Sequence, residues 1–186
     1  MAGGVEQEVK LRCPGVEAAR RAVSTLGAAL HRPARLQRDV LLDTPDRSLA
    51  ARGCVLRVRD DGGQAVLTYK GPVQPGLLKV REELETGAAS AERLLAILGA
   101  LGYAPVFRYE KRREEHAIPG ALVAIDETPV GTFLEIEGDA DAIHAAARTM
   151  GFADTDYVTA SYRSLYLASL PPGTEPGDMT FPDTRQ

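Results

Sequence analysis

The chain has 186 residues, of which 44% are hydrophobic and 26% are charged, and its net charge is −4. This composition is typical of one globular domain with a sizeable buried core. The acidic balance argues against binding to duplex nucleic acid, because such binding usually requires a basic excess.

The sequence carries no signal for a membrane or for an oxidising compartment. No stretch approaches the roughly 20 apolar residues of a membrane span, and residues 1–6 lack the basic and apolar segments of a secretory signal. Cys13 and Cys54 stand in neither a CxxC motif nor a metal-ligand spacing. We therefore expect a cytoplasmic protein without membrane partners, in which both cysteines are reduced and serve as small apolar side chains.

The first half of the chain is predicted to form strands around one helix. The helix is expected at residues 16–30, which are rich in Ala, Arg and Leu at roughly helical spacing, and His31-Arg32-Pro33 is expected to close it. Asp61-Gly62-Gly63 predicts a hairpin turn. The expected strands are residues 5–12, 36–43, 54–60, 64–70 and 78–85.

The second half continues with strands and helices. Strands are expected at residues 106–116, 121–127 and 132–137, and helices at residues 90–101, 139–150 and 159–170. Residues 171–186 contain Pro, Gly, Asp and Thr with little to bury, so we predict a disordered C-terminal tail. Residues 1–170 would then form one α+β domain built on a large antiparallel sheet or barrel.

Charged side chains alternate with apolar ones along nearly every predicted strand. In the first strand, Glu6, Glu8 and Lys10 share one face, while Val9 and Leu11 share the other. A sheet with one solvated face would explain any single strand. However, acidic pairs recur on three strands and basic pairs on most of the others, which favours a closed sheet with charges inside.

A charged interior is costly unless its groups are paired or bind a ligand. An oligophosphate with a divalent metal meets this demand. Arg and Lys bind phosphate oxygens, and carboxylates bind hard cations such as Mg²⁺ or Mn²⁺.

The order of these motifs resembles the CYTH superfamily, also called the triphosphate tunnel metalloenzymes. Its hallmark ExExK corresponds to Glu6-Gln7-Glu8-Val9-Lys10, and the match continues to about residue 168. The later motifs are Asp43-Thr44-Pro45-Asp46, Arg57-Val58-Arg59, Leu67-Thr68-Tyr69-Lys70-Gly71, Arg81-Glu82-Glu83-Leu84-Glu85, Glu110-Lys111-Arg112-Arg113, Ile125-Asp126 and Glu135-Ile136-Glu137-Gly138.

The resemblance implies a fold and a site. The fold is α+β, a closed eight-stranded antiparallel β-barrel (tunnel) with helices packed outside. The implied ligands of Mg²⁺ or Mn²⁺ are Glu6, Glu8, Asp126, Glu135 and Glu137. The implied phosphate-binding residues are Lys10, Arg57, Arg59, Lys70, Arg81, Lys111 and Arg113, with Glu83 and Glu85 as supporting acids.

The resemblance implies a small-molecule triphosphate as substrate. We expect hydrolysis of inorganic tripolyphosphate, with Lys10 as the catalytic residue that orients or deprotonates water. Such a lysine needs cationic neighbours to lower its pKa, and Arg57 and Arg59 are the candidates. The alternatives are a class IV adenylyl cyclase, a thiamine triphosphatase and a non-catalytic polyphosphate-binding module. The oligomeric state, monomer or homodimer, stays open.

Residues outside the matched motifs are predicted to play structural roles. Arg12 and Lys79 are expected to be exposed to solvent. Tyr162 is expected to pack, while Ser161 could reach the tunnel. Surface positions are expected for His31, His116, His144 and Glu127.

Overall fold

The computed structural model describes residues 4–182 and contains nine strands in that part of the chain. The strands are β1 (Gly4–Cys13), β2 (Ala29–Asp43), β3 (Val55–Asp61), β4 (Gln64–Lys70), β5 (Lys79–Ala88), β6 (Ala104–Ile118), β7 (Ala121–Thr128), β8 (Gly131–Gly138) and β9 (Tyr157–Val158). The helices are α1 (Val16–Ser24), α2 (Ser48–Ala51), α3 (Ala91–Ala100), α4 (Ala140–Thr149) and α5 (Tyr162–Ser169), with a 3₁₀ turn at Asp154–Asp156.

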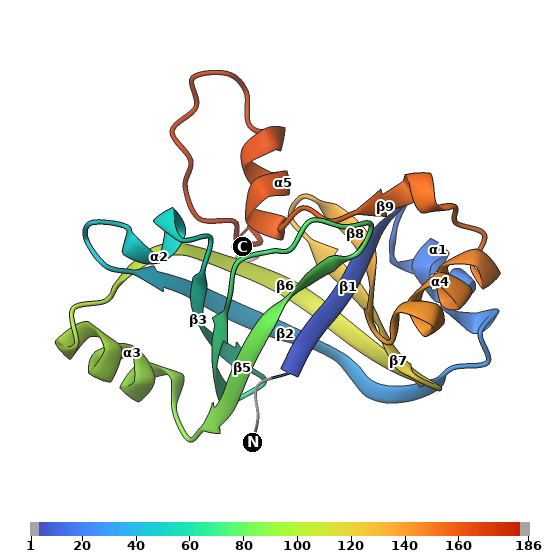
Figure 1. Ribbon diagram of the computed structural model, residues 1–186, viewed down its shortest axis with the longest axis horizontal. Coiled ribbons are helices and arrows are strands. Elements are labelled where there is room, and N and C mark those ends of the chain that lie inside the picture. The colour runs from blue at the N-terminus through green and yellow to red at the C-terminus, as the bar shows by residue number, and fades with distance from the viewer. Residues whose placement is uncertain (1–3, 183–186) are drawn as a thin grey trace.

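Eight of the strands close into a barrel. Their order is β5-β4-β3-β2-β6-β7-β8-β1, and β1 returns to pair with β5. Every neighbouring pair in this circuit is antiparallel. The two-residue β9 adds to β1 beside Lys10 and Leu11. The predicted fold, a closed eight-stranded antiparallel barrel with helices outside, is therefore confirmed (Figure 1).

The hydrophobic core lies outside the barrel wall, between the strands and the helices. On one side, α1 and α4 cover the outward side chains of β1, β7 and β8, including Val9, Leu11 and Ile136, each 0% exposed. On another side, α3 places Leu98 against Leu42 and Val58 (Figure 1). Because successive side chains of a strand point to opposite faces, apolar residues packed outward leave the alternating charged residues inside.

Gly138 ends β8 at a close backbone approach. Its φ is +152°, and a Cβ built there would lie 2.3 Å from the carbonyl oxygen of Gly120. Only glycine fits such a contact, so the strand that carries Glu135 and Glu137 is held closely against the β6–β7 turn.

The strand β2 is longer than the sequence predicts, and α1 is shorter. The predicted helix at residues 16–30 ends at Ser24, and His31-Arg32-Pro33 lies within β2. Here β2 pairs with β6 from Ala29 onward, with register shifts around Arg32 that accommodate the proline. Pairing with a distant strand thus overrides the local helical composition.

The tail predicted to be disordered, residues 171–186, is described up to residue 182, and that part holds neither helix nor strand apart from one bridge. Met179 is 1% exposed and forms a β-bridge to Tyr109. The bridge and the burial of Met179 help to dock this segment, although its composition offers little else to bury. Residues 183–186 lie outside the described part of the chain. Within residues 4–182, no helix is both long and apolar enough to cross a membrane.

Candidate active site

The barrel encloses a cavity of about 360 Å³ whose walls are mostly charged. Every site residue predicted from the sequence lines this cavity except Asp126. The predicted residues in its wall are Glu6, Glu8, Lys10, Arg57, Arg59, Lys70, Arg81, Glu83, Glu85, Lys111, Arg113, Glu135 and Glu137.

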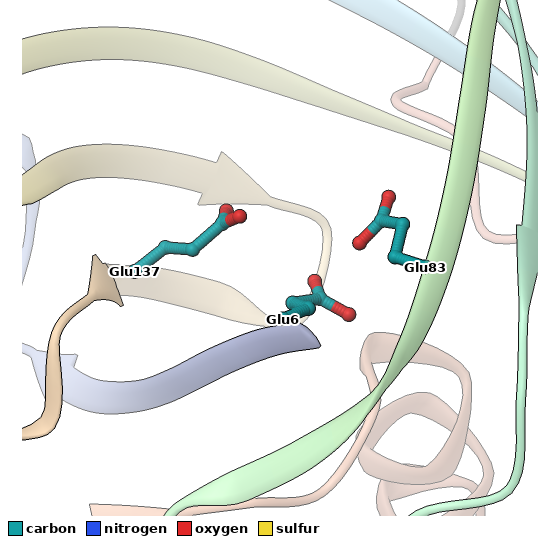
Figure 2. Close-up of side chains that lie close together, drawn as sticks. All are labelled: Glu6, Glu83 and Glu137. Atoms are coloured by element: carbon teal, nitrogen blue, oxygen red, sulfur yellow. The ribbon is translucent and has the colours of Figure 1, made fainter. Parts of the chain in front are cut away.

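Three carboxylates converge at one point of the cavity. Glu6, Glu83 and Glu137 reach toward one another from β1, β5 and β8 (Figure 2), and each offers an oxygen within 4.8 Å of the others. Lys70 bridges two of them, with Nζ 2.6 Å from Glu6 Oε1 and 2.9 Å from Glu83 Oε2. Arg81 Nε also lies 2.9 Å from Glu6 Oε2.

Glu137 is the member of this cluster whose charge is not balanced. Among the described residues it forms no ion pair. Burial, together with the negative charges of Glu135, Glu6, Glu83 and Glu8, raises its pKa to about 7. Carboxylate oxygens are the ligands that Mg²⁺ and Mn²⁺ prefer, and a divalent cation would offset the mutual repulsion. The donor set therefore fits such an ion.

Lys10 lies between two carboxylates. Its Nζ is 2.9 Å from Glu8 Oε1 and 3.1 Å from Glu135 Oε2. Burial alone would lower its pKa, but Glu135 and Glu8 outweigh burial and raise it. A lysine held in the ammonium form can donate hydrogen bonds and cannot accept a proton from water. Of the two roles predicted for Lys10, orienting water fits this ammonium form, whereas deprotonating water does not.

Burial lowers the pKa of two interior lysines, Lys79 and Lys111. Burial and the neighbouring guanidinium of Arg113 lower the pKa of Lys111 to about 8, against the opposing effect of Asp126 and Glu135. Its Nζ donates to Asp126 Oδ2 at 3.0 Å. A cationic neighbour that lowers the pKa was predicted for Lys10 and is found instead at Lys111.

Asp126 binds the side chains of Lys111 and Arg113 and does not line the cavity. It is 0% exposed and accepts hydrogen bonds from both Arg113 and Lys111. The hydroxyl of Tyr162 also donates to its Oδ2 at 2.7 Å. Both carboxylate oxygens of Asp126 thus accept hydrogen bonds from side chains, and its role as a metal ligand stays a prediction. Glu83, predicted only as a supporting acid, stands in the convergent cluster.

Asp39 and Lys79 are among the interior residues that were not predicted from the sequence. Asp39, 1% exposed, pairs with Arg59 Nε at 2.8 Å and Arg57 Nε at 3.4 Å. Lys79 was predicted to be exposed, which is wrong: it is 5% exposed and pairs with Glu8. The signal for Lys79 was present, because it shares the alternating face of β5 with Arg81 and Glu83. Asp39 shares its alternating face with Gln37 and Leu41, so the pattern of charges is weaker on that strand.

One end of the cavity is lined by a separate ion-pair network. Asp61 pairs with Arg32 Nη1 at 2.7 Å and with Arg35 Nε at 2.6 Å. Arg35 Nη2 also lies 3.0 Å from Glu115 Oε1. Their pairing depends on the register of β2 against β3 and β6, which the sequence does not specify.

A second, less polar pocket of about 200 Å³ adjoins the charged cavity. Leu41, Leu42, Val55 and Val106 form its apolar walls. It shares with the charged cavity the residues Arg57, Lys70, Arg81, Tyr109, Ser161 and Tyr162. Ser161 thus reaches the tunnel as predicted, and Tyr162 both packs and lines the cavity.

The remaining side chains agree with structural roles. Arg12 and His31 are exposed, while His116 and His144 are half-buried and hydrogen-bonded to Glu114 and the Tyr157 hydroxyl. Glu127 is partly exposed and pairs with Arg112. Cys13 and Cys54 are both free and buried.

Comparison with known proteins identifies the family. The CYTH domain family model matches residues 5–162. The chain belongs to the CYTH family. Of its relatives, adenylate cyclase CyaB of Aeromonas hydrophila is 28% identical over 181 residues, which cover 90% of this chain and 92% of that protein. A Methanocaldococcus jannaschii protein named as a candidate adenylate cyclase is 33% identical over 104 residues. That match covers 55% of this chain and 59% of the relative, less than two thirds of its length.

Solved CYTH-like structures share the fold. A candidate adenylate cyclase of Vibrio parahaemolyticus superposes with a TM-score of 0.79 at 20% identity, over 90% of this chain and 99% of that one. A Hippeastrum candidate adenylyl cyclase, described as having a dominant triphosphatase activity, gives 0.67 at 20% identity, over 90% and 97%. At these identities the likeness concerns the fold alone.

Proposed function

We propose that this CYTH protein is a divalent-metal-dependent enzyme that acts on a small-molecule triphosphate inside the barrel. The observation that carries the proposal is the convergence of Glu6, Glu83 and Glu137 beside Lys70 and Arg81. The unbalanced charge of Glu137 calls for a cation, and the adjacent lysine and arginine side chains call for an anion. A metal–triphosphate complex satisfies both at once.

The cation would be held by Glu6, Glu83 and Glu137. When bound, it would orient the phosphate chain and neutralise charge that develops during transfer. The residues of the opposite wall would bind the remaining phosphate oxygens, with Arg57 and Arg59 held in place by Asp39. Lys10, kept as an ammonium by Glu8 and Glu135, would donate to a phosphate oxygen.

For the reaction, we favour hydrolysis, with inorganic tripolyphosphate as the simplest substrate. A cavity lined mostly by charged side chains suits a chain of phosphates that carries no organic group. Lys111 is our candidate to orient or deprotonate the attacking water. Its pKa is about 8, so part of the Lys111 side chains carry a neutral amine close to physiological pH. The triphosphatase activity ascribed to the Hippeastrum protein lends support.

The second candidate is adenylyl cyclase. Two observations favour it: the apolar pocket beside the charged cavity has room for the organic part of a nucleoside triphosphate, and the curated relatives carry cyclase names. Cyclisation also requires that the ribose 3′-oxygen lie in line with the α-phosphorus, a positioning demand that hydrolysis of tripolyphosphate does not impose.

A substrate panel tests the proposal. Purified protein is incubated with tripolyphosphate, thiamine triphosphate or ATP, with Mg²⁺, Mn²⁺ or EDTA, and phosphate, pyrophosphate and cyclic AMP are quantified. We expect metal-dependent phosphate release from tripolyphosphate with a higher kcat/KM than that for cyclic AMP formation. Efficient cyclic AMP formation with negligible phosphate release would reverse the order of the two candidates. Binding of tripolyphosphate without turnover of any substrate would instead indicate a polyphosphate-binding module.

A further inference from the structure

The C-terminal strap, as we name residues 178–181, fills an edge of β6 that β7 leaves open. β7 pairs with β6 only from Arg112 onward, and the preceding part of β6 extends beyond it. There Met179 forms a parallel bridge to Tyr109. The Met179 N–H donates to the Arg108 carbonyl at 2.9 Å, and the Glu110 N–H donates to the Met179 carbonyl at 2.9 Å. The strap therefore adds a short strand to the barrel wall.

Contacts on either side of Met179 fix the strap in this register. The Arg108 N–H donates to Asp178 Oδ1 at 2.7 Å, and the Phe181 N–H donates to Glu110 Oε2 at 3.2 Å. The guanidinium of Arg112 lies 4.3 Å from the centre of the Phe181 ring. Figure 1 shows the chain after α5 looping away and returning to the barrel beside the start of that helix. The strap is thus docked by both backbone and side chains.

The side chain of Met179 lies behind the aromatic part of the cavity wall. It is 1% exposed and belongs to a cluster with Phe107, Tyr109, Phe133 and Tyr162. Tyr109 and Tyr162 line the charged cavity on their other side. Met179 is therefore the link between the strap and residues that face the site.

Tyr162, a member of the same cluster, extends from it into the charged interior. Its hydroxyl donates to Asp126, which also holds Lys111. The ammonium groups of Lys10 and Lys111 lie 5.2 and 5.3 Å from the centre of its ring. A shift of this ring would move the hydroxyl away from Asp126 and alter the surroundings of both lysines.

We propose that Met179 is a positioning residue, and that the strap acts through it to hold Tyr162 in the wall of the site. Packed interiors do not refill a lost side chain completely, so truncation of Met179 leaves space into which the two tyrosine rings relax. The effect on turnover rests on the proposed function, whereas the effect on the tyrosine rings does not.

The test uses the full chain and three point variants: Met179→Ala, Met179→Leu and Thr180→Ala. Thr180 is the matched control, because it lies in the strap with its side chain exposed. Ring signals of ¹³C-labelled tyrosine are recorded without substrate and assigned through Tyr162→Phe and Tyr109→Phe. Then kcat and KM for tripolyphosphate are measured, and Met179→Ala is combined with Tyr162→Ala in a double-mutant cycle.

We expect Met179→Ala to shift the Tyr109 and Tyr162 signals and to lower kcat/KM by between about 10- and 100-fold, as for a misplaced site. Met179→Leu should restore most of this loss, and Thr180→Ala should match the wild type. In the Tyr162→Ala background, Met179→Ala should add little further loss.

Unshifted tyrosine signals in folded Met179→Ala would overturn the proposal. So would a loss of kcat/KM on Met179→Ala that is equally large in the wild-type and Tyr162→Ala backgrounds. If Met179→Ala does not fold, the smaller truncation Met179→Val decides the same point by the same signals. A wild-type protein that turns over no triphosphate would refute the proposed function alone, because the ring signals still report on the strap.

Discussion

Replacing Glu137 with Gln should make the metal-free protein more stable at pH 8 while abolishing activity. Glu137 lies in a cluster of carboxylates, and its pKa in the folded chain is about 7 against an ordinary value of 4.5. Since the folded state resists ionisation, the unfolded state ionises first as pH rises. The resulting penalty on folding grows between pH 4.5 and 7 and then stays constant.

The size of this penalty follows from the two pKa values. Their difference corresponds to about 3 kcal/mol of unfolding free energy at pH 8. Gln keeps nearly the same volume without the charge, so Glu137→Gln should recover most of this amount. For a chain of this length, that corresponds to a rise in Tm of roughly 6–12 °C. At pH 4, where Glu137 is protonated in the folded chain and mostly protonated in the unfolded one, the two proteins should differ in stability by only about 0.2 kcal/mol.

Thermal and urea denaturation, followed by circular dichroism in EDTA from pH 4 to pH 8, measures the difference. Glu127→Gln is the matched control, because Glu127 lies on the neighbouring strand β7 with its side chain 39% exposed. It should change stability by no more than about 0.5 kcal/mol. Added Mg²⁺ should stabilise the wild type more than Glu137→Gln, since a ligand stabilises the state that binds it. A variant that is less stable at pH 8, or that differs equally at pH 4 and pH 8, would refute this reasoning.

Three further results are expected. If neutral Lys111 takes the proton from water, kcat should rise with pH up to about 8, and Lys111→Met should remove this rise; a wild-type profile that is flat between pH 6 and 9 would exclude the role. Asp126→Asn should lower the unfolding free energy in urea by about 3–5 kcal/mol, because it leaves buried cations unpaired, and an unchanged midpoint would contradict that account. Val106→Trp should fill the apolar pocket and lower kcat/KM for ATP about tenfold or more while leaving that for tripolyphosphate nearly unchanged; equal losses for both would show that the pocket does not hold the organic group.

The amino-acid sequence by itself determined the two faces of the barrel wall. Because side chains alternate along a strand, the period-2 placement of charges in residues 5–12 and 132–137 was enough to separate an apolar face from a charged one. With the ordered motifs, this led to the closed fold that the structure confirms, and to interior residues that all line the cavity except Asp126. The alternation of side chains depends only on their order in the sequence, so the two faces of a strand can be assigned without the tertiary structure.

Only the tertiary structure decided which interior charges meet. The closure of β1 on β5 brings Glu6 to Lys70 and Glu83, and the register of β1 against β8 sets Lys10 beside Glu135. These contacts separate the unbalanced Glu137 from the balanced Glu135, although both stand on one face of one strand. A pKa depends on burial and on charges a few ångströms away, and the sequence does not specify those distances.

The tertiary structure also decided where pairing with a distant strand overrides the local preference of the sequence. The predicted helix extends to residue 30, yet Ala29 and Leu30 form part of β2 because β6 offers a long strand to pair with. The strap has few apolar side chains to bury. It docks nevertheless, because the edge of β6 beside Arg108 and Glu110 lacks a partner from β7. In both places the deciding factor is a backbone hydrogen-bonding partner distant in sequence, and such a partner exists only once the barrel has closed.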